Sequence, residues 1–245
     1  MNRNLDTYNL AEQRNKLSHF TVQGFDLNGI IHVGANDGEE IHNYIRMGFD
    51  YIIGFEPMDG VFEKLQQDCF RWPSEIGISP KQLVVYKTAL HDVNEMHDFY
   101  VCVGDGKGST LMDIGYEEQK SVEWMDGLPM FIDHIKIQTQ TFYDWYNEEL
   151  EIIDLNNYDT LLLDTQGNEF QILNGMGDLL QEFKYLCIEL STVPMYKGEA
   201  PADVVSAWLE TKGFVQDSPL YEHNDAFFIR SDIKSHSDRV YLGRA

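Results

Sequence analysis

Two short segments near the N-terminus constrain the fold of this chain more than any other feature. Residues 30–38 read IIHVGANDG, which is an apolar strand, a glycine turn and the start of a helix. Residues 52–57 read IIGFEP, a second apolar strand that ends in the carboxylate of Glu56. In α/β sheets that bind a nucleotide, an acidic residue about 20 positions after such a turn binds the ribose hydroxyls. Either segment alone fits an ordinary strand–turn–helix joint, but the two together favour a ribose-bearing cofactor.

The spacing of the glycines distinguishes between cofactors. Gly34 and Gly38 are four residues apart, with Asn36 and Asp37 between them, whereas dinucleotide sites usually read G-x-G-x-x-G. An acidic turn at the start of a helix repels phosphate, but it tolerates a cationic sulfonium with an amino-acid tail. We therefore predict S-adenosylmethionine as the cofactor and S-adenosylhomocysteine as its product. A nicotinamide dinucleotide is the alternative.

Strand and helix patterns alternate along most of the chain, which predicts an α/β sheet with helices on both faces. The expected strands are 29–35, 51–57, 83–90, 98–103, 135–141, 158–164 and 185–190. The expected helices are 38–47, 60–69, 142–150, 168–182 and 202–212. Residues 8–19 predict a leading helix on the surface, and residues 214–221 and 226–230 predict a closing antiparallel hairpin.

The length of 245 residues favours one main domain. We expect an N-terminal helical extension over 1–28, the domain itself over 29–231 and a tail over 232–245. Residues 104–110 form a glycine-rich loop and residues 111–134 have few periodic signals. A loop of this length in a compact domain is usually a functional lid or a disordered segment, and we expect an inserted lid over about 104–134.

The formal net charge of -23 limits the partners of this chain. Binding to nucleic acid depends on cationic side chains that displace counterions, so neither DNA nor RNA is an expected substrate. Docking onto anionic lipid is equally unexpected. There is no stretch of 18 apolar residues and no signal-peptide pattern, and the three cysteines have no zinc or disulfide spacing. We therefore expect a cytoplasmic protein with no membrane insertion; its oligomeric state is left open.

Several motifs, spread in order from residue 29 to 230, resemble the FkbM family of S-adenosylmethionine-dependent methyltransferases. They are VGANDG at 33–38, FEP at 55–57, AL at 89–90, STL at 109–111, LDTQGNEFQILNG at 163–175, IE at 188–189 and VPMYKG at 193–198. The segment 163–175 is the most specific, because it resembles the signature apolar-D-x-E/Q-G-x-E-x-x-x-L-x-G. The resemblance implies a Rossmann-like, doubly wound, mostly parallel seven-stranded sheet. It also implies methylation of hydroxyl groups on sugars, glycolipids or polyketide-type products, with Tyr196 and Lys197 facing the substrate.

The turn and the resemblance together give a set of predicted cofactor contacts. They are His32, Gly34, Ala35, Asn36, Asp37, Gly38, Glu56, Pro57, Ala89 and Ser109. His32 departs from the family, which usually has an aspartate here that helps to hold the ammonium group of the cofactor. A neutral histidine can accept one hydrogen bond, whereas a protonated one would repel the cofactor. Asp37 either takes over this contact or caps the following helix.

Acids at the ends of later strands are the catalytic candidates, because ligands bind at the carboxyl edge of open α/β sheets. Asp164 is the predicted base that takes the proton of an acceptor hydroxyl. Glu169 shares this work, orients Asp164 or interacts with the helix dipole, and Glu189 is expected to bind substrate hydroxyls. The three together could form an oxygen-rich site for Mg²⁺ or Ca²⁺, but no other ligands are visible and a metal is not favoured.

These observations predict an O-methyltransferase that acts on a saccharide or natural-product acceptor. Two alternatives remain. A non-catalytic binding module of the same fold is favoured by His32, whereas the intact acids Glu56, Asp164 and Glu169 argue against it. A dinucleotide-dependent oxidoreductase is disfavoured by the missing G-x-G-x-x-G pattern.

Overall fold

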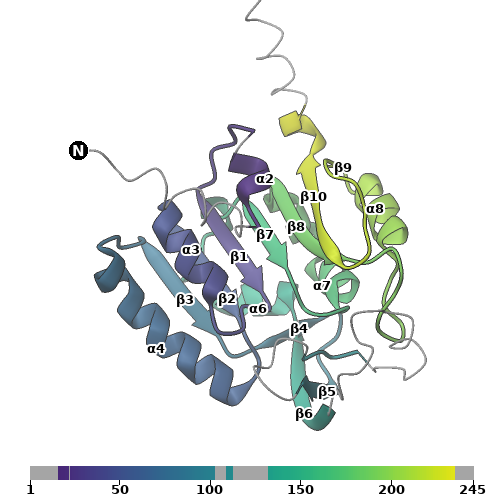
Figure 1. The fold of residues 1–245 in the computed structure, drawn as a ribbon, viewed down its shortest axis with the longest axis horizontal. Coiled ribbons are helices and arrows are strands. Elements are labelled where there is room, and N and C mark those ends of the chain that lie inside the picture. Colours follow the sequence, from purple (N-terminus) through teal and green to yellow (C-terminus); the bar gives the residue numbers. More distant parts are fainter. Residues whose placement is uncertain (1–15, 22, 103–108, 113–131, 235–245) are drawn as a thin grey trace, which may run out of the picture.

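The computed structural model describes residues 16–21, 23–102, 109–112 and 132–234, and its centre is a sheet of seven strands (Figure 1). The strand order is β3-β2-β1-β7-β8-β10-β9. The strands are β1 Gly29–Val33, β2 Tyr51–Phe55, β3 Gln82–Tyr86, β7 Thr160–Leu163, β8 Tyr185–Leu190, β9 Phe214–Gln216 and β10 Asn224–Arg230. All neighbours are parallel except the two pairs that β10 makes with β8 and β9. The predicted doubly wound, mostly parallel sheet with an antiparallel C-terminal pair is confirmed.

The helices cover both faces of this sheet. They are α2 Ser18–Thr21, α3 Glu39–Met47, α4 Asp59–Ile76, α6 Phe142–Glu149, α7 Glu169–Met176 and α8 Ala202–Thr211, with 3-10 turns at Leu155–Asn157 and Gly177–Glu182. Successive side chains of a strand point to opposite faces. In β1, Ile30 therefore packs with residues of α3 and α4, whereas Ile31 packs with residues of α6, α7 and α8. The sheet thus separates two apolar cores.

A small second sheet lies near the carboxyl ends of the main strands (Figure 1). It contains β4 Ala89–His91, β6 Ile132–Thr141 and β5 Met96–Cys102, in the order β4-β6-β5. The prediction of one continuous strand over 83–90 is wrong, because the chain leaves the main sheet after Tyr86 and pairs with β6 from Ala89 onward. Leu90 and Ala89 thereby come to lie beside the strand ends of the main sheet.

Two helices differ from their predicted lengths. Helix α4 continues past residue 69 through Pro73 to Ile76. Proline lacks an N–H group and removes one bond of the helix, but the helix closes regularly beyond it, since Gly77 in the left-handed region donates its N–H to the carbonyl of Pro73. The expected helix 168–182 is α7 followed by a 3-10 turn, with the break at Gly177.

The segment before β1 is not a surface helix in its described part. Leu17 and Phe20 are fully buried, and the ring of His19 stacks on Phe227 of β10 at 4.2 Å between centroids. Residues 8–15 lie outside the described residues, as does most of the predicted lid; its last residues, 132–134, belong to β6. The domain limits at 28 and 231 remain predictions. Among the described helices, none combines the length and the apolar character that crossing a membrane requires.

Candidate active site

A cavity opens at the carboxyl ends of β1, β2 and β7 and is closed from the other side by β4 and β5. Eight of the predicted site residues line it: Gly34, Asn36, Asp37, Glu56, Pro57, Ala89, Ser109 and Asp164. Glu40, Thr88, Leu90, Phe99 and Gln166 also line it. His32, Ala35, Gly38, Glu169 and Glu189 are not part of its lining. The sequence motifs around residues 34, 56, 89, 109 and 164 therefore meet at one place.

Glu56 is held rigidly at one end of this cavity. Its two carboxylate oxygens accept hydrogen bonds from the backbone N–H groups of Asn36, at 3.0 Å, and of Met58, at 2.8 Å. Burial raises the pKa of Glu56 to about 7, although both hydrogen bonds favour the charged form. A buried acceptor between apolar walls such as Phe55 and Leu90 fits a ribose diol with its attached adenine. These residues therefore fit the nucleoside part of S-adenosylmethionine.

Gly34 is required where β1 enters the turn. Its φ is +89°, and a Cβ atom at this position would lie 1.8 Å from the backbone oxygen of Asp164. The N–H groups of Gly34 and Ala35 both donate to the carbonyl of Phe55, at 3.0 and 2.9 Å. The turn is thus fixed against β2 and β7 at once, which brings Glu56 and Asp164 to the same cavity.

His32 lies behind this turn, with 1% of its surface exposed. Its Nδ1 atom is 3.4 Å from the hydroxyl of Tyr44, and in the described part of the chain its Nε2 atom has no hydrogen-bond partner. Burial lowers the pKa of His32 to about 3, so the ring is neutral. The carboxylate of Asp37 lies 3.7 Å from Nζ of Lys64.

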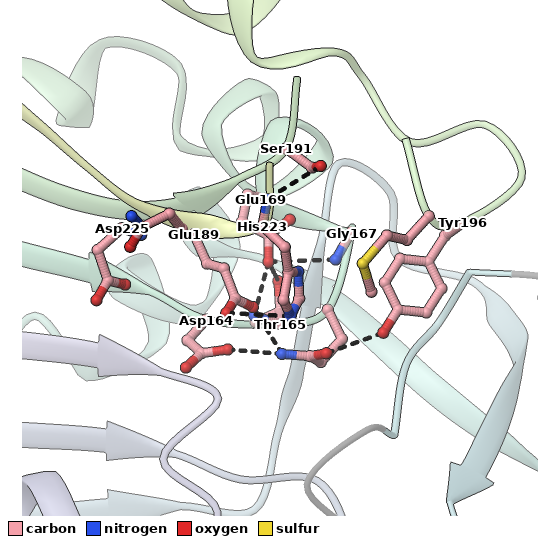
Figure 2. A network of polar contacts seen from close by, with 12 residues as sticks. Asp164, Thr165, Gly167, Glu169, Glu189, Ser191, Tyr196, His223 and Asp225 are labelled. Atoms are coloured by element: carbon pink, nitrogen blue, oxygen red, sulfur yellow. Dashed lines mark hydrogen bonds and ion pairs between the residues drawn. The ribbon is translucent and has the colours of Figure 1, made fainter. Parts of the chain in front are cut away.

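Next to the cavity, Asp164, Glu189 and Asp225 form a group that we call the carboxylate cluster (Figure 2). The side-chain amide of Gln166 joins two of its members, donating to Asp164 at 2.9 Å and to Glu189 at 2.6 Å. The amide oxygen of Gln166 accepts a hydrogen bond of 2.8 Å from the hydroxyl of Tyr196. The ends of β7 and β8 are therefore linked by a polar network.

Lys16 neutralises part of this cluster. Its Nζ atom lies 2.5 Å from Oδ2 of Asp164 and 3.2 Å from Oδ1 of Asp225. Burial favours the neutral amine, but Asp164, Asp225 and Glu189 nevertheless raise the pKa of Lys16 above its usual range.

Asp164 and Glu189 respond to this environment in opposite directions. Burial opposes the ionisation of Asp164, but the charge of Lys16 holds the pKa of Asp164 below its usual range. Burial and the negative charge of Asp164 raise the pKa of Glu189 well above its usual range. Asp164 is therefore the member of the pair that ionises more readily, and Glu189 is the one that retains a proton to higher pH.

Glu169 lies under the loop between β7 and α7 and is fully desolvated. Its Oε1 atom accepts hydrogen bonds from the backbone N–H and the hydroxyl of Thr165, at 2.7 and 3.0 Å, and from the N–H of Gly167 at 3.3 Å. Burial raises the pKa of Glu169 to about 7. These hydrogen bonds fix the conformation of the loop that carries Asp164 and Gln166.

In the described part of the chain, no group of three or more His, Cys, Asp or Glu side chains is arranged to hold a metal ion. The oxygen-rich site of Asp164, Glu169 and Glu189 is therefore not formed.

Four residues at this edge of the sheet were not predicted as site residues: Lys16, Glu40, Gln166 and Asp225. Gln166 is part of the 163–175 motif, and that motif was the only signal for it. Asp225 lies in the expected hairpin, and Glu40 in an acidic first turn that is common at helix starts. Lys16 has no local signal, because it is separated from Asp164 by 148 positions.

Comparisons with known proteins agree with this architecture. Residues 32–216 match the methyltransferase FkbM domain. The 2-O-methyltransferase NoeI of Sinorhizobium fredii is 23% identical over 198 residues, which are 78% of this chain and 74% of that protein. The crystal structure of methyltransferase FkbM from Methylobacillus flagellatus has the same fold, with a TM-score of 0.52 and 13% identity; the match covers 88% of this chain and about half (48%) of that one. The chain belongs to the FkbM family of S-adenosylmethionine-dependent methyltransferases.

Proposed function

We propose that this enzyme transfers a methyl group from S-adenosylmethionine to a hydroxyl group of a saccharide or related natural product. The observation that carries the proposal is the position of Asp164. It lines the cofactor cavity and belongs to the carboxylate cluster, so one side chain faces both the predicted methyl donor and an adjoining polar surface. The relative NoeI is a 2-O-methyltransferase, which supports an oxygen acceptor.

The residues have separate tasks in this proposal. When bound, S-adenosylmethionine supplies a methyl group on a positively charged sulfur. Glu56 and the turn that begins at Gly34 hold the cofactor, while the polar groups of Gln166, Glu189 and Tyr196 bind acceptor hydroxyls. Holding the acceptor oxygen in line with the methyl group can contribute about 7–11 kcal/mol to lowering the barrier.

Asp164 receives the proton of the acceptor hydroxyl as the new carbon–oxygen bond forms. Its Oδ1 atom has a lone pair beyond the one that accepts from Gln166, and Lys16 keeps the group ionised. A base of low pKa is weak, but proximity to the reacting hydroxyl compensates for part of this weakness. Glu169 is a positioning residue, because it fixes the loop that carries Asp164.

The alternative of a dinucleotide-dependent oxidoreductase has no support in the site, because the acidic side chains of Asp37, Glu40 and Asp164 line the cavity where a pyrophosphate would be needed. A non-catalytic binding module would hold the cofactor in the same cavity and would differ from the proposed enzyme only in that no methyl group is transferred. The carboxylate cluster beside the cavity favours turnover, since cofactor binding alone does not require it.

Calorimetric titration with S-adenosylhomocysteine, with NAD as control, tests the cofactor. We expect binding of the first ligand and none of the second. A second assay tests the acceptor. It measures transfer of the tritiated methyl group from labelled S-adenosylmethionine to a panel of glycans and polyols, each compared with its deoxy analogue. Cofactor binding without transfer to any hydroxyl would contradict the assignment as an O-methyltransferase.

A further inference from the structure

Four acidic side chains line the cofactor cavity: Asp37, Glu40, Glu56 and Asp164. Three of them are already occupied. Glu56 accepts two backbone N–H groups, Asp164 binds Lys16 and Gln166, and Asp37 faces Lys64 near the outer mouth. Each of these carboxylates therefore has a partner before any ligand is bound.

Glu40 is different from the other three. Within the described residues, the bond that its carboxylate makes is with its own backbone N–H, and no other side chain pairs with it directly. Lys16 and Asp164 are its charged neighbours. Burial raises the pKa of Glu40, which shows that the group is removed from water without a partner that compensates fully. An incoming cation would therefore gain more binding free energy at Glu40 than at an acid that already has a partner.

The position of Glu40 matches one end of the expected ligand. Glu56 holds the ribose at the β2 side of the cavity, so the remainder of the ligand extends toward β1 and β7. Glu40, in the first turn of α3, faces this other end together with Asp164. The amino-acid tail of S-adenosylmethionine, with its primary ammonium group, is expected there.

His32 does not provide this contact. The ring is buried outside the lining of the cavity and its nearest polar neighbour is the hydroxyl of Tyr44. The surrounding charge also favours a cation. Among the described residues, four acidic groups interact with the ammonium of Lys16: Glu40, Asp164, Glu189 and Asp225.

We infer that Glu40 binds the ammonium group of the methionine tail, as the cavity acid that is left open for it. This inference rests on the proposed use of S-adenosylmethionine and adds a residue to that site. The contact is an ion pair with hydrogen bonding in a partly buried place, which is worth about a 10- to 100-fold change in affinity.

Calorimetry with two probes tests this inference. S-adenosylhomocysteine contains the ammonium group, whereas 5′-methylthioadenosine has the same nucleoside but no amino-acid tail. We expect Glu40→Gln to weaken binding of S-adenosylhomocysteine roughly 10- to 100-fold and to leave binding of 5′-methylthioadenosine unchanged. Glu40→Asp, which retains the charge on a shorter side chain, should lie between Glu40→Gln and the wild type.

Glu39→Gln is the matched control, because it removes a neighbouring acid that is exposed and outside the cavity lining. It should bind both probes like the wild type, and thermal unfolding should verify that all variants are folded. Equal affinity of Glu40→Gln and wild type for S-adenosylhomocysteine would overturn the inference. Failure of the wild type to bind S-adenosylhomocysteine would instead contradict the proposed cofactor itself.

Discussion

Lys16 and Asp164 form an ion pair of 2.5 Å that connects the segment before β1 to the end of β7. Both side chains are mostly shielded, with 17% and 22% of their surface exposed. A charge pair in such a place is strong only while both partners are present, because the loss of one leaves the other buried and unpaired. The ionisation of the predicted base therefore depends on a residue that precedes the main sheet.

Lys16→Met should lower stability by about 1–3 kcal/mol, since it leaves Asp164 without its counterion. It should also raise the pKa of Asp164. As the pH is lowered, methyl transfer by the variant should therefore begin to decline at a higher pH than methyl transfer by the wild type. The folded-state pKa of Asp164 is depressed, and the stabilisation from the pair is therefore present above the unfolded pKa and lost as the pH falls. Urea unfolding and the pH dependence of kcat/KM measure both effects. Lys16→Arg, which retains the charge, should resemble the wild type; an unchanged acid limb in Lys16→Met would refute the assigned role.

Asp164→Asn should reduce turnover about 10²- to 10⁴-fold, the range for loss of a positioned base. Binding of S-adenosylhomocysteine should be nearly preserved, because Asn keeps the shape and the hydrogen bond with Gln166 can still form. Single-turnover transfer to the best acceptor and calorimetry separate the two quantities. If cofactor affinity and turnover fell together by the same factor, Asp164 would be a binding residue instead of the base.

Glu56→Gln should weaken S-adenosylhomocysteine binding roughly 10- to 100-fold. The amide group would turn an N–H donor toward the N–H of Asn36 or Met58, both of which now meet carboxylate oxygens. Unlike Glu40→Gln, this variant should also lose affinity for 5′-methylthioadenosine, since the ribose is common to both ligands. Retained affinity for the nucleoside would contradict the ribose contact.

Gly167→Ala should disturb the acceptor side of the site. The φ of Gly167 is +98°, and a Cβ atom would lie 2.6 Å from Cδ2 of Tyr196, whose hydroxyl binds Gln166. We expect a stability loss of about 1–3 kcal/mol from the strained backbone and an increase of KM for the acceptor. Gly48→Ala is the control, because Gly48 has a φ of +88° with no atom within 4 Å of the added methyl group. Thermal unfolding of both variants separates backbone strain from the clash with Tyr196.

His32→Asn should change the pH dependence of folding without weakening S-adenosylhomocysteine binding. The pKa of His32 is lowered to about 3 in the folded protein, so the unfolded chain binds an extra proton between about pH 6.5 and pH 3. Stability from this group is present above the unfolded pKa and falls with decreasing pH by at most about 1.4 kcal/mol per unit. Urea unfolding between pH 4 and pH 7 should show a shallower acid decline in the variant. An identical slope would mean that His32 does not remain neutral.

The pattern of apolar runs predicted the individual strands of the main sheet, because strands such as Leu161–Leu163 are buried on both faces and have no competing periodicity. The split between β3 and β4 was not predictable in this way. Residues 83–90 read LVVYKTAL and resemble one strand, and pairing of Ala89 with Thr139 on β6 draws the end of this segment into another sheet. Long-range pairing of this kind leaves no trace in local composition.

The candidate site was predictable to a similar extent. Glycine turns and acids at strand ends identify Gly34, Glu56 and Asp164, because their chemistry and their position in a strand coincide. Lys16 and Glu40 could not be identified in this way, because a lysine in a polar segment and a glutamate at a helix start occur on most protein surfaces. Tertiary folding places them at the site. Their importance follows from the partners that the fold brings to them.

The two acids that Lys16 contacts are made at very different times during synthesis. Asp225 belongs to β10, which inserts between β8 and β9 and is the last strand of the described chain. Until β10 is synthesised, Asp164 is the one of these two acids that the ammonium of Lys16 can pair with. The balance of charge beside the cavity is reached when the C-terminal strand enters the sheet. The environment of Lys16 beside the cavity is therefore complete only in a chain that includes the C-terminal strand.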